Sequence, residues 1–440
     1  MSVMSVAQPW ELPLTPPALP SVPVMPTQGP PADRAGFVGD SGPYWRLMVW
    51  GTLLQAVTLG LYRFWLFTDM RRYLWSHTVI DGESLEYTGT PVELVLGFLI
   101  AIGILIPIYA AIFVGTLELG MVSRFSSLLG LAVFAVFRKY ASYRVRRYRL
   151  TRTVLRGIRF HQNGSALLYA IRATLWSIAN IATLGLTYPW AVASLERYKM
   201  HHTFYGDLGG KFAGAGWRLF LRGFPIWIAI VAPIVGGLTA AAATLDLPAI
   251  THALSLGKGS AVLGALLKTK NFDFGAGLGF GGIVLSIVLL VVLYPAFQAI
   301  VMRWWLAGLQ IGGASAASDL RIRRYYGAYS RYAICVVGLA FAVLFAIGII
   351  ATAAKVLGFA AVADGHSGAG MALALAAYVA FLLPAWTVYQ VVVTFRLWQV
   401  AAQSVTVRGL ATLENVQASQ ASSTAVGEGL ADALFGAAAI

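Results

Sequence analysis

A short motif occurs twice in this chain, and the two copies lie 125 residues apart. The first copy consists of Thr58, Leu59, Gly60, Leu61, Trp65, Arg72, Tyr73 and His77. The second copy consists of Thr183, Leu184, Gly185, Leu186, Trp190, Arg197, Tyr198 and His202. Each copy stands just before a long apolar run. Because the offset is the same for every pair, the sequence predicts a duplicated module.

The composition places these modules in a lipid bilayer. The chain is 58% hydrophobic and 11% charged, whereas an ordinary soluble chain is about a quarter charged. A helix needs roughly 20 apolar residues to cross a bilayer. Five uncharged runs reach that length, namely 94–117, 223–245, 274–302, 332–354 and 367–395. A sixth apolar run, 125–137, is shorter, and we expect its helix to continue through Tyr143.

The distribution of basic residues predicts the orientation, because cytoplasmic loops carry an excess of Lys and Arg. With six crossings and the amino terminus inside, the inner segments hold 27 of the 32 Lys and Arg residues. If the ambiguous runs 47–62 and 173–195 also crossed, strongly basic loops would face outward. We therefore expect six crossings with both termini in the cytoplasm. The net charge of +14 follows from this bias and is no argument for binding nucleic acid.

The two ambiguous runs contain the motif, and each is predicted to form a helix–turn–helix at the cytoplasmic leaflet. Gly60 and Gly185 stand where a helix end needs a residue that adopts positive φ. Pro189 suits the first turn of a new helix, and Trp65 and Trp190 suit the headgroup level. An interfacial helix pair and a re-entrant hairpin covered by other helices both fit these features.

Shorter patterns predict turns and a cap. The polar, Gly-rich connectors 81–89 and 206–214 favour small turns. Thr90-Pro91-Val92-Glu93 has the form of a capping box. The residues Arg147, Leu150 and Gly157 recur at the same spacing as Arg303, Leu306 and Gly313, which is a weaker echo of an internal repeat.

The predicted fold class is an all-α polytopic membrane protein. Segments 37–143 and 144–302 are two modules, each with an interfacial or re-entrant helix pair and a transmembrane hairpin. Segment 303–395 contributes the third transmembrane hairpin. Segment 1–36 carries nine prolines and is expected to be a disordered tail,, and segment 396–440 is expected to be a cytoplasmic tail.

At these residues the chain resembles the YjgN-like family of bacterial inner-membrane proteins, a domain of unknown function. The resemblance covers most of residues 37–440. Its opening pattern is Phe37, Gly39, Gly42, Tyr44, Thr58 to Tyr62, Arg72-Tyr73 and Glu86-Tyr87. Its later pattern is Thr183 to Leu186, Pro189-Trp190, Arg197-Tyr198, Gly206-Asp207 and the acidic end around Glu428 and Asp432. The resemblance implies a multi-pass protein of the inner membrane and no particular activity.

Three groups of residues are candidates for function. On one helix the arginines Arg138, Arg149, Arg152, Arg156 and Arg159 would share a face that binds anionic lipid,. Arg172 interrupts an apolar stretch, where a charge either has a function or reaches the headgroups. His77 and His202 lack a Cys partner and metal-ligand spacing, so we expect helix caps and neither a metal nor a cofactor.

No paired carboxylates, Ser–His pair or metal cluster recommends an enzyme. The internal repeat and the prolines within the apolar runs favour a transporter or channel-like protein. The alternative is a non-catalytic, membrane-organising protein that binds anionic lipid. Membrane lipids are the expected partners in either case, and the sequence leaves open a homo-oligomer and the substrate.

Both motif copies should lie on the cytoplasmic side of the membrane. With Cys335 replaced by serine, a cysteine at Ile80 or Asp207 should react with an impermeant thiol reagent only after the inner membrane is opened. A cysteine at Lys258, in a predicted outer loop, should react in intact spheroplasts and is the matched control. Labelling of position 80 or 207 from the periplasm would contradict the six-crossing topology.

Overall fold

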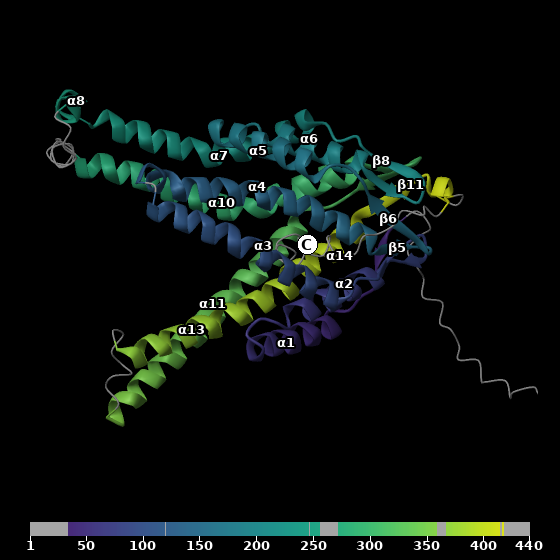
Figure 1. The fold of residues 1–440 in the computed structure, drawn as a ribbon, viewed down its shortest axis with the longest axis horizontal. Helices are drawn as coiled ribbons and strands as arrows, with labels where there is room; N and C mark the ends of the chain where they lie inside the picture. Colours follow the sequence, from purple (N-terminus) through teal and green to yellow (C-terminus); the bar gives the residue numbers. More distant parts are fainter. Residues whose placement is uncertain are drawn as a thin grey trace, which may run out of the picture.

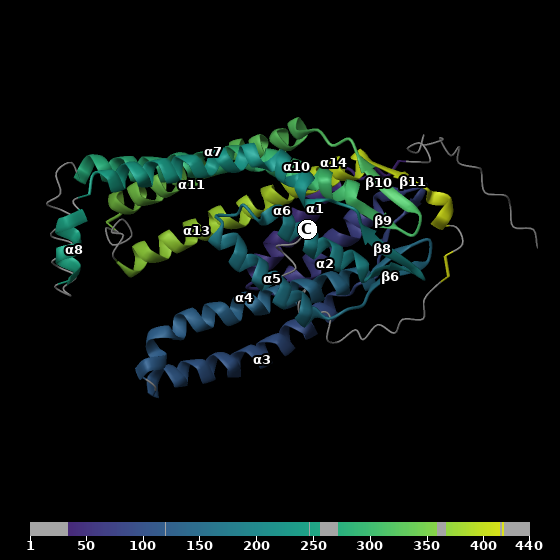
Figure 2. The same ribbon diagram turned by 90° about the horizontal axis from the view of Figure 1, so that it is seen from above.

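The computed structural model describes residues 34–118, 120–245, 247–255, 272–358, 367–413 and 416–417. Short strands gather at one end of the molecule, and long helices extend from that end in pairs (Figure 1). Figure 2 shows from above that the pair α3 (Pro91–Glu118) and α4 (Gly120–Thr151) lies apart from α7 (Gly216–Ala243) and α10 (Phe272–Gly308). The helices α11 (Ile322–Val356) and α13 (Gly368–Val388) form the third pair.

Four helical segments are long and apolar enough to cross a membrane, namely Gly216–Ala243, Asp273–Gly308, Ile322–Val356 and Gly368–Ser404. The last of these segments includes a π-helix, η1 (Tyr389–Phe395), and the helix α14 (Arg396–Ser404). A shorter helix, α8 (Leu247–Ser255), follows α7. These four helices agree with four of the six predicted crossings. They indicate a membrane protein.

The two motif copies form two helix pairs of equal length. These are α1 (Ser41–Val57) with α2 (Arg63–Ser76), and α5 (Ala166–Ala182) with α6 (Tyr188–His201). Every boundary of the second pair lies 125 residues after the matching boundary of the first.

The predicted positive φ of the motif glycines is confirmed, with 90° at Gly60 and 85° at Gly185. The leucine before each glycine shares the left-handed conformation, which the sequence did not predict. The motif threonine explains why the turn is tight. The Thr183 hydroxyl donates to the Ala179 carbonyl and accepts from the Thr187 N–H, and Thr58 does the same in the first copy. One hydroxyl thus joins the end of one helix to the start of the next.

The predicted fold class is confirmed in part, because the described residues are mostly helical, but the fold is not purely α: eleven strands connect the ends of the described helices. They are β1 (Gly36–Phe37), β2 (Thr78–Ile80), β3 (Glu83–Ser84), β4 (Glu86–Tyr87), β5 (Thr153–Leu155), β6 (Ile158–Gln162), β7 (Thr203–Tyr205), β8 (Leu208–Phe212), β9 (Leu309–Ile311), β10 (Ala314–Ser318) and β11 (Val405–Arg408). All pairs are antiparallel. Strands of two to five residues leave almost no alternating pattern, so the sequence signal is weak.

Main-chain hydrogen bonds join these strands into a closed ring. Strands β4 to β11 pair in chain order, and β1, β2 and β3 pair beside them. Leu85 connects β3 directly to β4, and its N–H donates to the Thr78 carbonyl. At the other side Arg34 pairs with Thr406, and the Ala35 N–H donates to the Val405 carbonyl at 3.1 Å. The first and last strands described therefore lie side by side.

Four two-residue turns make the hairpins of this ring. They are Asp81-Gly82, Arg156-Gly157, Gly206-Asp207 and Gly312-Gly313. Asp81 and Gly82 both have positive φ, as hairpin turns of this length favour,. The predicted turns in both polar connectors are confirmed. The weaker echo also has a structural counterpart, since β5 and β6 precede β9 and β10 by a constant 156 residues.

An aromatic core holds the beginning of the described chain against its end. Tyr44 of α1 stacks on Phe395 of η1 with ring centroids 4.9 Å apart, and Phe37 of β1 meets the same ring edge-on. Phe37, Tyr44 and Phe395 all belong to one buried cluster, which also includes Met48 and Met70. Residues 1–33 of the predicted tail 1–36 lie outside the described residues. Residues 34–36 are described and belong to the ring. A short 3₁₀ turn, Leu410–Leu413, follows β11.

Candidate functional site

The tyrosine and histidine of each motif copy fasten the helix pair to itself. The Tyr73 hydroxyl donates to the Asp40 carbonyl at 2.7 Å, and the Tyr198 hydroxyl donates to the Ser165 carbonyl at 2.9 Å. His202 Nδ1 lies 2.8 Å from the Tyr198 carbonyl, and the first copy repeats this contact. A ring nitrogen that faces a carbonyl carries the proton, so each histidine caps its helix end. This agrees with the predicted structural role.

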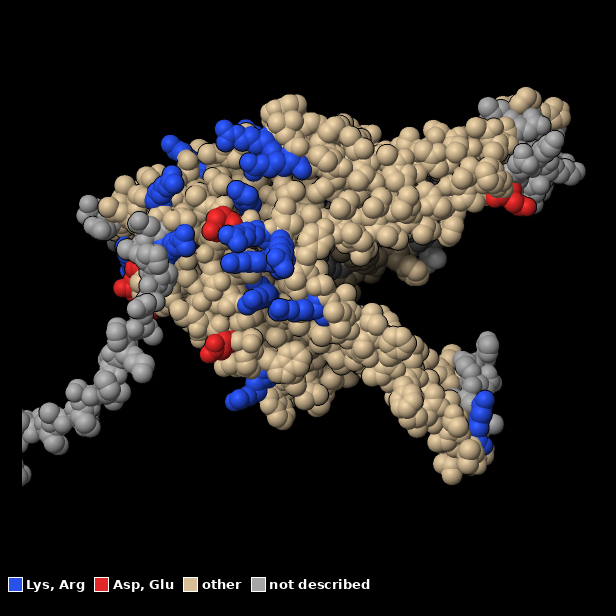
Figure 3. Space-filling model, turned by 180° about the vertical axis from the view of Figure 1, so that it is seen from behind, with Lys and Arg blue, Asp and Glu red and all other residues tan. Residues whose placement is uncertain are grey.

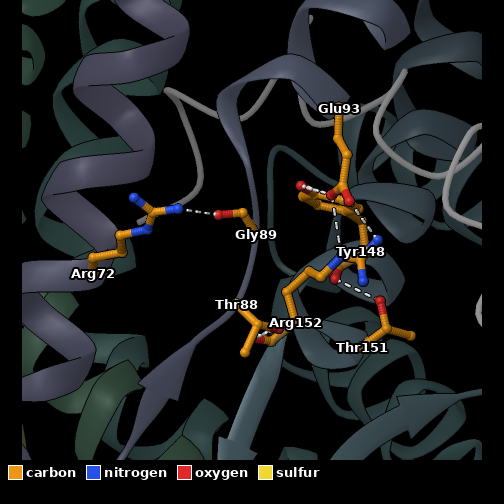
Figure 4. A network of polar contacts seen from close by, with 7 residues as sticks. All are labelled: Arg72, Thr88, Gly89, Glu93, Tyr148, Thr151 and Arg152. Atoms are coloured by element: carbon orange, nitrogen blue, oxygen red, sulfur yellow. Dashed lines mark hydrogen bonds and ion pairs between the residues drawn. The ribbon is translucent and has the colours of Figure 1, made fainter.

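The motif arginines differ between the two copies. Arg72 donates to the Gly89 carbonyl at 3.0 Å and lies 3.8 Å from Asp69. Figure 4 shows the Arg72 side chain reaching across to Gly89 in the connector before α3. Arg197 instead bonds only the Ala193 carbonyl of its own helix and stays exposed. Arg197 of the second copy is therefore an available cation, whereas Arg72 of the first copy makes contacts within the fold.

The predicted arginine stripe on one helix was wrong, because α4 ends at Thr151. Arg138 and Arg149 lie on α4, but the other three arginines follow its end. Arg152 is buried and binds both oxygens of Glu93, at 2.8 and 3.1 Å. Arg156 occupies a hairpin turn and pairs with Asp81, and Arg159 is exposed on β6.

Glu93 thus has partners that the capping-box pattern did not reveal. Besides Arg152, it accepts a hydrogen bond from the Tyr148 hydroxyl at 2.8 Å. In Figure 4 both side chains converge on the Glu93 carboxylate. This ion pair ties the first turn of α3 to the end of α4, so its role is structural.

A basic crevice of about 690 Å³ lies beside the second helix pair. Its cationic side chains are Arg172 of α5, Arg197 of α6 and Lys211 of β8, and two histidines, His201 of α6 and His202 after α6, also line it. No Asp or Glu lines it. In the part of the chain that the structure describes, Arg172, Arg197 and Lys211 form no ion pair.

Two ring systems shape the wall of this crevice. The Arg172 guanidinium carbon lies 5.0 Å from the centre of the Tyr198 ring, a cation–π contact that holds the side chain over α6. Tyr198 also packs against His202, with ring centroids 4.4 Å apart. The sequence marked Arg172 as a charge within an apolar stretch and Arg197 and His202 as motif residues, but it did not predict that they share one crevice. It missed Lys211, which only the β8 hairpin brings to the crevice.

An exposed apolar face continues from the crevice along α5. It consists of Leu168, Ile171, Leu175, Ile178 and Ile181, whose exposed fractions range from 42% to 78%. A basic rim next to an apolar helix face is the pattern of a helix that lies in the headgroup region of a bilayer. Arg172 therefore lies at the border between the basic crevice and the apolar face of α5.

A buried charge cluster behind the crevice fixes α6 to its neighbours. Glu196 of α6 pairs with Lys199 and accepts from Trp305 of α10 at 3.1 Å. Burial by itself raises the pKa of this carboxyl, but the cations Lys199 and Arg146 outweigh it and hold the pKa below its usual value. Glu196 therefore stays ionised and neutralises cations that would otherwise be buried alone.

Within the described ranges, no group of three or more His, Cys, Asp or Glu could hold a metal ion. Asp207, the carboxylate nearest to His202 in sequence, accepts from the Gln417 N–H at 3.1 Å.

Comparison with known proteins identifies one family. The model of a bacterial protein family of unknown function, DUF898, matches residues 32–433. This match is consistent with the YjgN-like resemblance, which is confirmed. No curated protein matches the chain, and no solved structure matches it either.

Replacing Glu196 by glutamine should destabilise the protein by about 3 kcal/mol, because it leaves Lys199 and Arg146 buried without a counter-charge. The control is Asp69→Asn, which breaks an exposed pair and should change stability by less than about 0.5 kcal/mol. Thermal unfolding in detergent measures both.

Since the pKa of Glu196 is lowered on folding, the contribution of Glu196 to stability is complete above the usual pKa value of 4.5 and is lost at lower pH,. The difference between wild type and Glu196→Gln should therefore shrink below about pH 4.5; a difference that does not change with pH would contradict the assigned ion pair.

Proposed function

The chain belongs to the bacterial family of unknown function DUF898, and on that premise we propose that it is a multi-pass inner-membrane protein that binds anionic lipid headgroups at the cytoplasmic surface. In this proposal α3 and α4 cross the bilayer together with the four apolar helical segments. The ring of strands and both termini lie in the cytoplasm.

A belt of arginines near the ring supports this orientation. Three helices that follow a hairpin carry arginine within their first ten residues, at Arg172 in α5, at Arg218 and Arg222 in α7, and at Arg323, Arg324 and Arg331 in α11, whereas α3 has none there. Figure 3 shows a band of Lys and Arg near the strand end, and arms that are almost free of charge up to their tips. Basic residues favour the cytoplasmic side, so the belt marks the inner headgroup layer.

The position of the second motif turn supports an interfacial helix pair. Trp227 of α7 donates to the Leu184 carbonyl at 2.8 Å, which fixes the turn five residues beyond Arg222. At 1.5 Å per residue the tip lies about 8 Å past the basic belt. Interfacial helices bury their apolar face to about 5–10 Å. Leu59 and Leu184, exposed by 95% and 62%, would both enter the acyl chains.

Duplication of an ancestral module accounts for the matching helix pairs. The equal offset of the helices α1, α2, α5 and α6 and the paired left-handed turns support it. Two such pairs would anchor the ring at two places on the same leaflet.

The main observation in support of lipid binding is the basic crevice at Arg172. Its three cationic residues, Arg172, Arg197 and Lys211, have no carboxylate among them, and the exposed apolar face of α5 begins beside them. A phosphate headgroup would neutralise the crevice while an acyl chain covers the apolar face. Each Lys or Arg near an anionic membrane contributes about 1 kcal/mol, or about fivefold in affinity.

The double variant Arg172→Gln/Lys211→Gln should bind dioctanoyl phosphatidylglycerol about 25-fold more weakly than wild type. Isothermal titration of the purified protein in a neutral detergent measures the affinity, and dioctanoyl phosphatidylcholine is the uncharged reference. Arg408→Gln removes an exposed charge from β11, outside the crevice, and should leave the affinity within about twofold. Equal phosphatidylglycerol binding by the double variant and by Arg408→Gln would refute the crevice as the site.

Transport is the second candidate function, and the prolines within the long helices favour it. Pro107, Pro233, Pro295 and Pro384 lie inside α3, α7, α10 and α13, and internal prolines bend helices. An apolar crevice of about 680 Å³ runs between α1 and α13 beside Pro384. On the face in Figure 3 the helical arms diverge and leave an open notch.

If the protein transports a solute, proteoliposomes should show flux above empty liposomes, and Arg172→Ala should reduce it. The measurement is uptake of a broad panel of ions and small solutes. Flux no greater than that of empty liposomes across the whole panel would end this candidate, and it would leave the lipid-binding proposal unaffected.

A further inference from the structure

A second arginine cluster lies in a crevice of about 430 Å³ between α11 and α14. Its cations are Arg321 at the N-cap of α11, Arg323, Arg324 and Arg331 from the first three turns of α11, and Arg396, the first residue of α14. The basic crevice at Arg172 shares no lining residue with it. It therefore needs its own explanation.

The spacing of residues on both helices builds this crevice. On α11, Arg324, Gly327, Ala328 and Arg331 follow the i, i+3, i+4, i+7 pattern of one helix face. On α14, Arg396, Val400 and Gln403 follow i, i+4, i+7. Gly327 and Ala328 supply a floor of small side chains, and a Cβ placed on Gly327 would meet nothing within 4 Å. The two faces thus enclose a space with arginines at its edges.

The π-helix before α14 sets the position of Arg396. Tyr389–Phe395 is a seven-residue π-helix, and Arg396 follows it directly. The wider turn rotates the following residues relative to a continuous α-helix. Val391, Val393 and Phe395 of this segment are buried, so the packing of the π-helix determines which face of α14 meets α11. π-helical segments are frequently found at functional sites.

The charges of this cluster are not balanced by the protein. No Asp or Glu lines the crevice, and none of the five arginines takes part in an ion pair with a described residue. Arg396 donates to Gln399, a neutral partner. Five like charges in one crevice repel one another, and the free N–H groups at the start of a 35-residue helix add to the positive potential,.

An adjoining crevice connects the arginines to an apolar surface. Arg331 and Arg396 line both spaces, and the second one, of about 570 Å³, continues along Ile334, Val391 and Phe395 and is also lined by the acidic residue Asp40. A ligand with an anionic head and an apolar tail would fill the two together. Arginine forks bind phosphate oxygens in pairs, and forks from two helices suit a group with three terminal oxygens.

We propose that the five arginines between α11 and α14 bind a phosphomonoester, a dianionic group that is carried either by a lipid or by a soluble molecule. A phosphodiester headgroup offers one charge and two terminal oxygens, so it matches the cluster less well. The site is separate from the crevice at Arg172, and the proposal does not depend on phosphatidylglycerol binding there.

The experiment titrates the full-length protein in neutral detergent with three probes: dioctanoyl phosphatidic acid, inorganic phosphate and dioctanoyl phosphatidylglycerol. Phosphatidic acid should bind at least about tenfold more tightly than phosphatidylglycerol. Its affinity should rise between about pH 5.5 and 7.5, because the second ionisation of a phosphomonoester has a pKa of about 6. Inorganic phosphate that binds as tightly as phosphatidic acid would support a soluble phosphomonoester, and weaker phosphate binding would support a lipid.

Two variants and two controls locate the binding. Arg324→Gln/Arg396→Gln should weaken phosphatidic acid binding by at least about tenfold. Arg324→Lys keeps the charge but loses the fork, and it should weaken binding severalfold. Arg172→Gln and Arg408→Gln should leave it unchanged. The variants remove exposed side chains, and unchanged melting temperatures would show that they fold.

Equal affinity for phosphatidic acid and phosphatidylglycerol, or full binding by the double variant, would overturn this assignment. Loss of phosphatidylglycerol binding in Arg172→Gln/Lys211→Gln with full phosphatidic acid binding would support two separate sites. Failure of both lipids to bind wild type would reject both proposals.

Discussion

The ring of main-chain hydrogen bonds is the constraint on which the rest of this structure depends. Hairpins whose strands have two to five residues are only marginally stable in isolation, and an open edge strand can pair with a wrong partner. Closure removes both problems, because every hairpin has a neighbour on each side. The contact of Arg34 and Ala35 with Val405 and Thr406 is therefore critical, since it joins segments about 370 residues apart in sequence. The aromatic stacking of Tyr44 on Phe395 supports the same junction from the helical side.

The ring also explains why arginines from distant helices lie at one level. The hairpins β5–β6, β7–β8 and β9–β10 are each followed by a helix after three residues, so a residue a fixed number of positions into each of these helices lies at a similar height above the ring,. Arg172 and Arg222 are both the seventh residue of their helices, α5 and α7. A belt of positive charge thus follows from repeated local connections, and no long-range pairing of the arginines is needed. The same repetition brings the first turns of α11 beside α14.

The sequence predicted the features that depend on local pattern, and it failed where distant segments meet. The helix pairs, the glycines at positive φ and four apolar helices are present as predicted. The stripe from Arg138 to Arg159 was wrong because helical spacing was extended across Arg156-Gly157, which is a hairpin turn. The β-branched and apolar residues Thr153, Val154 and Leu155 were the available signal for a strand. The partner of Glu93 lies 59 residues away, so no local pattern could have identified it, and the same holds for Lys211 and Arg396.

The two helix pairs differ at one buried position in the sign of the charge. Arg71 in the first copy corresponds to Glu196 in the second, at the common offset. Arg71 is buried and donates to the Tyr87 hydroxyl in the ring, so its charge is used within the fold. Glu196 instead neutralises Lys199 and Arg146 behind the crevice. Because Glu196 already pairs with buried cations, it does not neutralise the cations at the surface. Arg172 and its neighbours therefore remain available to an external anion. On the proposed function, the first copy stabilises the fold, and the second copy also presents the cations that would bind a lipid headgroup.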